Sequence, residues 1–126
     1  MAERDPEVLA AFAEEAQERL LSLEAGLLEL ERTPILPPPG LLDAVFRDAH
    51  SVKAGANLLG LRGLERAAHS LENVLDTIRK GKLTPTDDIV STLLEGVDLL
   101  SDLLGETGNP EDMRRRLDAL TRLSPA

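Results

Sequence analysis

Two polar residues 22 positions apart, His50 and Glu72, form the pair in this sequence best suited to chemistry. Read at about 100° per residue, the stretch around His50 is a helix whose apolar residues share one side: Val45, Ala49, Val52, Ala56 and Leu59. His50 points away from that side, where a neutral imidazole adds nothing to a core. Lys53, one turn further on, supplies a positive charge beside it. This setting favours a histidine that acts as a nucleophile.

That chemistry requires a partner for the imidazole, and the turn after this helix predicts one. Gly60 and Gly63 bound a short turn, so the two helices that it joins are antiparallel neighbours. His50 and Glu72 then lie about the same number of residues from the turn and, at ~1.5 Å rise per residue, at the same height. A carboxylate that accepts the Nδ1 proton fixes the tautomer and leaves Nε2 with a free lone pair. Nε2 is then able to attack a γ-phosphoryl group, while Lys53 offsets charge on the phosphoryl oxygens.

His69 falls on the same edge of the second of these helices as Glu72. It either supports the network around His50 or packs at the edge of the helical bundle. Asn57 is interpreted as a solvent-facing residue. The run Arg114–Arg116 is interpreted as a solvated face of a short helix rather than a binding patch.

Composition predicts an all-α protein. The chain has 126 residues, enough for a single domain over 1–126. Its 42% of apolar residues include only two aromatics, Phe12 and Phe46, so the core is aliphatic and suits helix-on-helix packing. Cysteine is absent, which excludes disulfides and thiolate metal sites. No apolar run approaches the ~20 residues of a membrane span and no signal-peptide pattern is present, so a cytoplasmic location is expected.

The charge distribution separates the segment around His50 from the rest of the chain. The formal net charge is −9, which argues against nucleic acid as a partner. Residues 43–82, however, carry five acids and seven bases. A locally positive segment in an acidic protein is suited to holding a small anion such as a phosphoryl group.

Helical periodicity predicts five amphipathic helices, over about residues 6–32, 41–59, 64–80, 86–104 and 110–123. The proline-rich stretch 33–40 is unable to continue a helix and joins the first two. Gly26, inside the first helix, costs about 1 kcal/mol for no reason visible in the sequence. The predicted fold is an antiparallel up-down four-helix bundle with an additional C-terminal fifth helix.

Two runs of residues carry a resemblance to a known family. They are Phe46-Arg-Asp-Ala-His50-Ser-Val-Lys53-Ala-Gly55-Ala, followed by Leu59-Gly60, and His69-Ser-Leu-Glu72-Asn73. Over nearly the whole chain the sequence resembles the histidine phosphotransfer (HPt) domain at the N-terminus of CheA-type chemotaxis histidine kinases. The resemblance implies that His50 is phosphorylated on Nε2 and that Glu72, Lys53 and His69 form a hydrogen-bonded network around it. The family usually has glycine after the lysine; the methyl group of Ala54 is expected to slow partner docking without abolishing it.

The resemblance also implies a place in two-component signalling. A kinase ATP-binding domain, in the same chain or in trans, would transfer the γ-phosphoryl group of ATP to His50. An aspartate of a response-regulator receiver domain would then remove it. ATP and Mg²⁺ would be used by the kinase and Mg²⁺ by the receiver; the chain has no Gly-rich phosphate loop or acidic metal cage, so it is expected to bind neither. It is therefore a substrate and donor, either as a stand-alone protein or as a fragment of a larger kinase.

Two other classes of function remain open. One is a structural or dimerisation bundle in which His50 is incidental. The other is a metal-binding bundle that uses His50, His69, Glu65 and Glu72. Di-iron bundles need a Glu-x-x-His motif on each of two helices plus two further glutamates, and this chain has no such motif.

Overall fold

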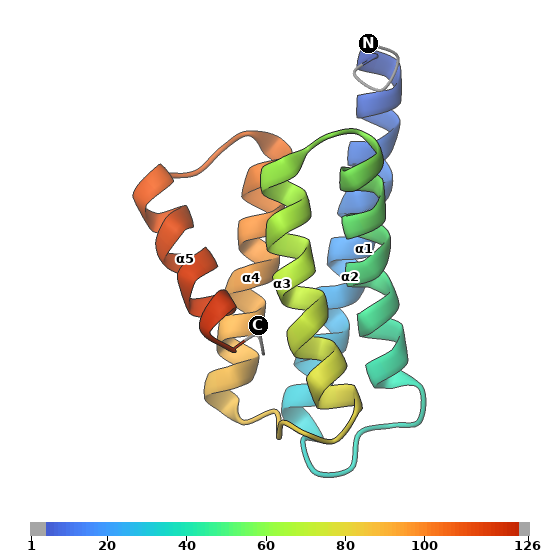
Figure 1. Cartoon of the computed structure of the whole chain (residues 1–126). Coiled ribbons are helices and arrows are strands. Elements are labelled where there is room, and N and C mark those ends of the chain that lie inside the picture. The colour runs from blue at the N-terminus through green and yellow to red at the C-terminus, as the bar shows by residue number, and fades with distance from the viewer. Residues whose placement is uncertain (1–4, 124–126) are drawn as a thin grey trace.

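Five α-helices account for most of the chain in the computed structural model, which describes residues 5–123 (Figure 1). They are α1 (Pro6–Arg32), α2 (Leu41–Leu58), α3 (Arg62–Arg79), α4 (Asp87–Gly105) and α5 (Pro110–Leu123). Helices α1 to α4 run alternately down and up and pack in a ring, each against the next and α4 against α1. Helix α5 lies outside the ring against α4 and α3. The predicted all-α bundle with a fifth helix is confirmed.

Helices α1, α4 and α5 begin where a side chain accepts hydrogen bonds from free backbone N–H groups of the first turn. At the start of α1, the Asp5 carboxylate accepts a hydrogen bond from the backbone N–H of Glu7 at 2.8 Å. Asn109 does the same for α5, accepting from Glu111 at 2.9 Å. No helix within residues 5–123 is long and apolar enough to cross a membrane.

The turn between α2 and α3 sets the height at which their side chains meet. Gly60 takes a positive φ of 70°, which glycine adopts without steric cost. The Leu61 backbone N–H donates to the Ala56 carbonyl at 2.9 Å, and the Leu61 carbonyl accepts from Glu65 at 2.9 Å. Helix α3 therefore begins at Arg62, two residues earlier than the periodicity indicates, and the chain reverses within three residues.

The core is aliphatic and built mainly from leucine. Helices α1 and α2 are packed tightly at two positions where one of them carries glycine. A Cβ on Gly26 would lie 2.3 Å from Val45 Cγ1, and one on Gly55 would lie 2.4 Å from Phe12 Cε1. Both distances are far inside van der Waals contact, so any side chain would push the helices apart. This close packing is the reason for the glycine inside α1.

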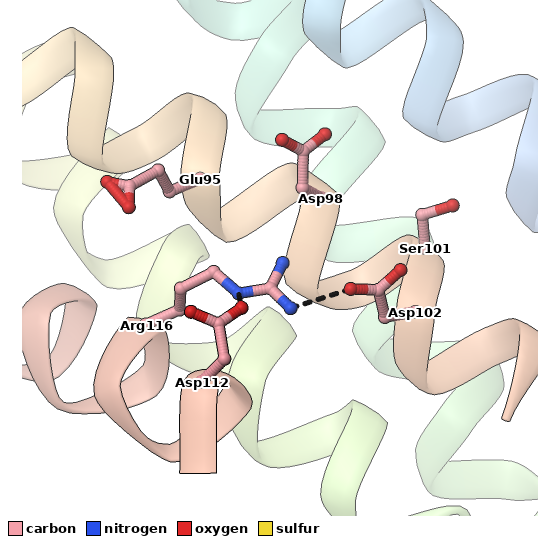
Figure 2. Close-up of a pocket in the computed structure, with 6 residues that line it drawn as sticks. All are labelled: Glu95, Asp98, Ser101, Asp102, Asp112 and Arg116. Carbon is pink, nitrogen blue, oxygen red and sulfur yellow. Dashed lines mark hydrogen bonds and ion pairs between the residues drawn. The ribbon is translucent and has the colours of Figure 1, made fainter. Parts of the chain in front are cut away.

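A buried arginine fastens α5 to α4 (Figure 2). The Arg116 side chain is 8% exposed, and its Nη2 donates to Asp102 Oδ2 at 2.6 Å. Its Nε lies 3.1 Å from Asp112 Oδ2. The interpretation of Arg114–Arg116 as a solvated face is wrong for Arg116, because two carboxylates on adjacent helices hold its guanidinium against the bundle. Arg114 and Arg115 are exposed.

Candidate functional site

The predicted pair meets across the seam between α2 and α3. His50 Nδ1 is in hydrogen-bonding contact with Glu72 Oε2. The other oxygen of the same carboxylate, Oε1, accepts from Lys53 Nζ at 2.8 Å. The His50 side chain is 54% exposed, whereas Glu72 is only 9% exposed. One inward carboxylate therefore holds an outward imidazole and a lysine at the same time.

The ionisation of Glu72 decides which ring nitrogen carries the proton. Burial raises the pKa of its carboxyl group, but hydrogen bonds and charge from Lys53 and His50 outweigh burial and leave the pKa below its usual 4.5. At neutral pH the group is a carboxylate, which only accepts hydrogen bonds. His50 must then donate from Nδ1, and a neutral ring carries its lone pair on Nε2. Nε2 has no hydrogen-bond partner within residues 5–123.

Sequence reasoning missed the roles of two further side chains. One contacts the imidazole of His50, and the other contacts the first. The Phe46 ring is stacked with the His50 ring, with 6.0 Å between centroids and 14° between planes. The Arg79 guanidinium carbon lies 3.9 Å from the centroid of the Phe46 ring. The spacing of four residues between Phe46 and His50 was the available signal, because side chains one turn apart on a helix are neighbours.

His69 lies near this network but is not bonded to it. Its side chain is exposed and makes no hydrogen bond or ion pair with any part of the chain that the structure describes. It lines a shallow depression with Lys53, Ala54, Asn57 and Glu65. A supporting role for His69 stays a prediction.

Asn57 differs from its sequence interpretation, because it makes an interhelical contact. Its Nδ2 donates to Glu65 Oε2 at 2.6 Å, although both residues remain partly open to solvent. This bond joins α2 to α3 nearer the turn than the His50–Glu72 contact.

A polar contact between α1 and α2 lies near His50. Asp48 is 6% exposed, and one of its oxygens lies 3.5 Å from Arg19 Nη1. Arg19, Arg47 and Ser22 line a depression that reaches His50. Asp48 lines the same depression, so two cations and one carboxylate border the space beside the imidazole. The excess of positive charge suits a negatively charged reactant.

The proposed metal alternative finds no geometric support. Within residues 5–123, no three or more His, Asp or Glu side chains are grouped so that they could hold a metal ion. His50 and Glu72 meet, but as a hydrogen-bonded pair in which Lys53 occupies the second carboxylate oxygen.

Residues 7–123 match the Hpt domain family. The chain belongs to this family. Its sequence is 36% identical over 113 residues to that of chemotaxis protein CheA from Rhizobium meliloti. The aligned region covers 87% of this chain. The chain spans only 15% of the length of that relative.

Solved structures place the fold with CheA phosphotransfer domains. The CheA phosphotransferase domain from Thermotoga maritima is 32% identical, with a TM-score of 0.73 over 79% of this chain and 93% of that one. The phosphorylated P1 domain of CheA3 from R. sphaeroides, in complex with CheY6, is 25% identical, with a TM-score of 0.79 over 92% of this chain and 94% of that one. This chain is therefore a phosphotransfer domain of the CheA type, as its sequence motifs predict.

Proposed function

We propose that this Hpt domain carries its phosphoryl group on Nε2 of His50, receiving it from ATP through a kinase domain and passing it to a receiver aspartate. The observation that carries the proposal is the contact of Nδ1 with an ionised Glu72. It leaves Nε2 as the nucleophilic nitrogen on a ring that is 54% exposed.

In each of the two phosphoryl transfers one bond to phosphorus forms and one breaks, and His50 neither gains nor loses a proton. In the first, the Nε2 lone pair attacks the γ-phosphorus of ATP; the N–P bond forms, the bond to the bridging oxygen breaks, and ADP leaves. The ring keeps its Nδ1 proton and becomes cationic, and the Glu72 carboxylate offsets that charge. In the second, a carboxylate oxygen of the receiver attacks phosphorus, the N–P bond breaks, and the electron pair returns to Nε2.

Lys53 has two roles in this proposal. It donates to Glu72 at 2.8 Å and so helps to keep that carboxylate ionised. An ammonium group has three donors, so the pairing leaves donors for a phosphoryl oxygen. The bases Arg19 and Arg47, which line the depression reaching His50, add to a positive field around the incoming group.

The family and one relative support the proposed partners. The R. sphaeroides P1 domain is seen with CheY6, which supports a receiver domain as acceptor here. The donor would be a CheA-type ATP-binding domain, acting within a longer chain or in trans. ATP and Mg²⁺ would be bound by these partners, because in the proposed chemistry this domain supplies only the nucleophile. A cytoplasmic location stays a prediction.

Phosphorylation of matched variants by a CheA-type kinase domain and γ-labelled ATP tests the proposal. The wild-type domain should take up label that is acid-labile and base-stable, as a phosphoramidate is. His50→Gln should fold with the same circular dichroism and take up none, whereas the control His69→Gln should still be labelled. Label on His50→Gln would place the acceptor elsewhere. An unlabelled wild-type domain would favour the purely structural bundle.

A further inference from the structure

A single hydrogen bond does not fix the plane of a ring that is more than half exposed. Glu72 holds His50 at Nδ1, but the imidazole can still tilt about that contact and turn its lone pair away from a reactant. In-line attack on phosphorus requires that lone pair to be aimed. A contact on the face of the ring is what limits the tilt.

Phe46 supplies that contact. It lies one turn before His50 on α2, and the two rings are nearly parallel, 14° apart, with 6.0 Å between centroids. This is the offset stacked arrangement that aromatic rings favour. Phe46 is only partly buried, although it packs against the core. Its ring therefore needs a support of its own on the solvent side.

Arg79, near the end of α3, covers the Phe46 ring. Its guanidinium carbon lies 3.9 Å from the ring centroid, well within the range of a cation–π contact. The guanidinium is itself held on two sides, by Asp76 at 2.6 Å and by Asp43 at 3.4 Å. Hydrogen bonds from Lys80 and Arg79 lower the pKa of Asp76, so that carboxylate stays ionised at neutral pH.

We propose that Arg79 is a positioning residue for phosphotransfer: it clamps Phe46 against the imidazole of His50 and so aims Nε2 at the incoming phosphorus. This inference rests on the proposed role of His50. A planar guanidinium suits the task because it stacks on a ring while its edge binds carboxylates, which a lysine ammonium is unable to do.

The structure provides a matched control on the same carboxylate. Lys80 Nζ lies 2.8 Å from Asp76 Oδ2, so it pairs with the carboxylate that binds Arg79. Lys80 takes no part in the ring contact at Phe46. Arg79→Met and Lys80→Met therefore each remove one cation from Asp76, but only the first removes the clamp.

The experiment measures phosphorylation by a CheA-type kinase domain at saturating ATP, together with the proton chemical shifts of the His50 ring. Arg79→Met should lower the limiting rate constant by about twofold to fivefold with little change in KM for the domain. The His50 ring protons should shift as the Phe46 ring moves. Arg79→Lys should not restore the rate. Lys80→Met should match wild type in both measurements.

A double substitution tests whether Arg79 acts through Phe46. Phe46→Leu should also slow the reaction, and adding Arg79→Met to it should cause no further loss. Equal losses in Arg79→Met and Lys80→Met, or additive losses in the double variant, would overturn the inference. So would wild-type rates and ring shifts in Arg79→Met. None of these outcomes touches the role of His50, which fails if His50→Gln is labelled or if the wild-type domain takes up no label.

Discussion

The imidazole of His50 and the carboxylate of Glu72 are in direct contact, yet one is mostly outside the bundle and the other almost wholly inside it. Their side chains are 54% and 9% exposed. The inner partner is thereby shielded from competing water, which strengthens its hold on Nδ1. The outer partner keeps Nε2 open to a reactant. Removing the inner partner should affect reactivity more than folding.

Glu72→Ala should slow phosphorylation of the domain by roughly tenfold to hundredfold, the range typical when a carboxylate that orients a metal-binding histidine is removed. The physical reason is loss of tautomer control and of the negative charge that offsets the cationic phosphorylated ring. The rate is measured with a CheA-type kinase domain and labelled ATP. Glu65→Ala, which removes a carboxylate of the same helix that binds Asn57 and not His50 or Lys53 within residues 5–123, is the control. An unchanged rate in Glu72→Ala would remove this residue from the mechanism.

Stability should depend on pH through Glu72. Because its folded pKa is lower than the usual 4.5, the native state binds fewer protons here than the unfolded state as the pH falls below that value. Its contribution to stability is thus fully present above pH 4.5 and is lost as the pH falls through the folded pKa. Urea unfolding of wild type and Glu72→Gln, measured from about pH 7 down to about pH 3, should show the two curves converging in acid. A constant difference in free energy across that range would contradict this prediction.

Lys53→Met should raise the pKa of the Glu72 carboxyl group. Burial already raises this pKa, and the hydrogen bond from Lys53 is the largest of the opposing effects. A carbon-detected NMR titration of the Glu72 side chain measures the change directly. Lys82→Met, at an exposed lysine in the turn after α3, should leave the titration as it is in wild type. If Lys53→Met and wild type titrate together, Lys53 does not keep Glu72 ionised.

Gly26→Ala should destabilise the fold even though alanine is the better helix former. The gain of about 1 kcal/mol in helix propensity is outweighed by forcing a methyl group to 2.3 Å from Val45 Cγ1, where overpacking costs about 1–3 kcal/mol. Gly63→Ala is the matched control, since its new Cβ would meet nothing closer than 3.8 Å. It should be neutral or stabilising in thermal and urea unfolding. A Gly26→Ala domain more stable than wild type would mean that α1 and α2 can separate without cost.

Sequence reasoning succeeded where one helix or one turn decides the outcome. The number of helices follows from the apolar period of each segment. The His50–Glu72 contact follows from a short turn placed midway between the two residues, because that fixes their heights. Both inferences need only the helical rise per residue and the direction of the chain.

Sequence reasoning failed where a contact depends on how two helices are rotated and spaced relative to each other. Arg116 reads as a solvated base until α4 brings Asp102 beside it. The glycine at position 26 is explained only by the close approach of Val45 on α2. The contact of Arg79 with Phe46 joins residues whose heights match but whose rotamers no periodicity specifies.

The open ring nitrogen of His50 has a kinetic consequence. In the proposed relay, Nε2 of His50 is the reacting nitrogen in both transfers, because Nδ1 is held by Glu72. The donor and acceptor proteins therefore visit the same place in turn. They compete for it, and neither can be present while the other reacts. Under that proposal the domain follows ping-pong kinetics, with its phosphorylated form as the intermediate between the two half-reactions.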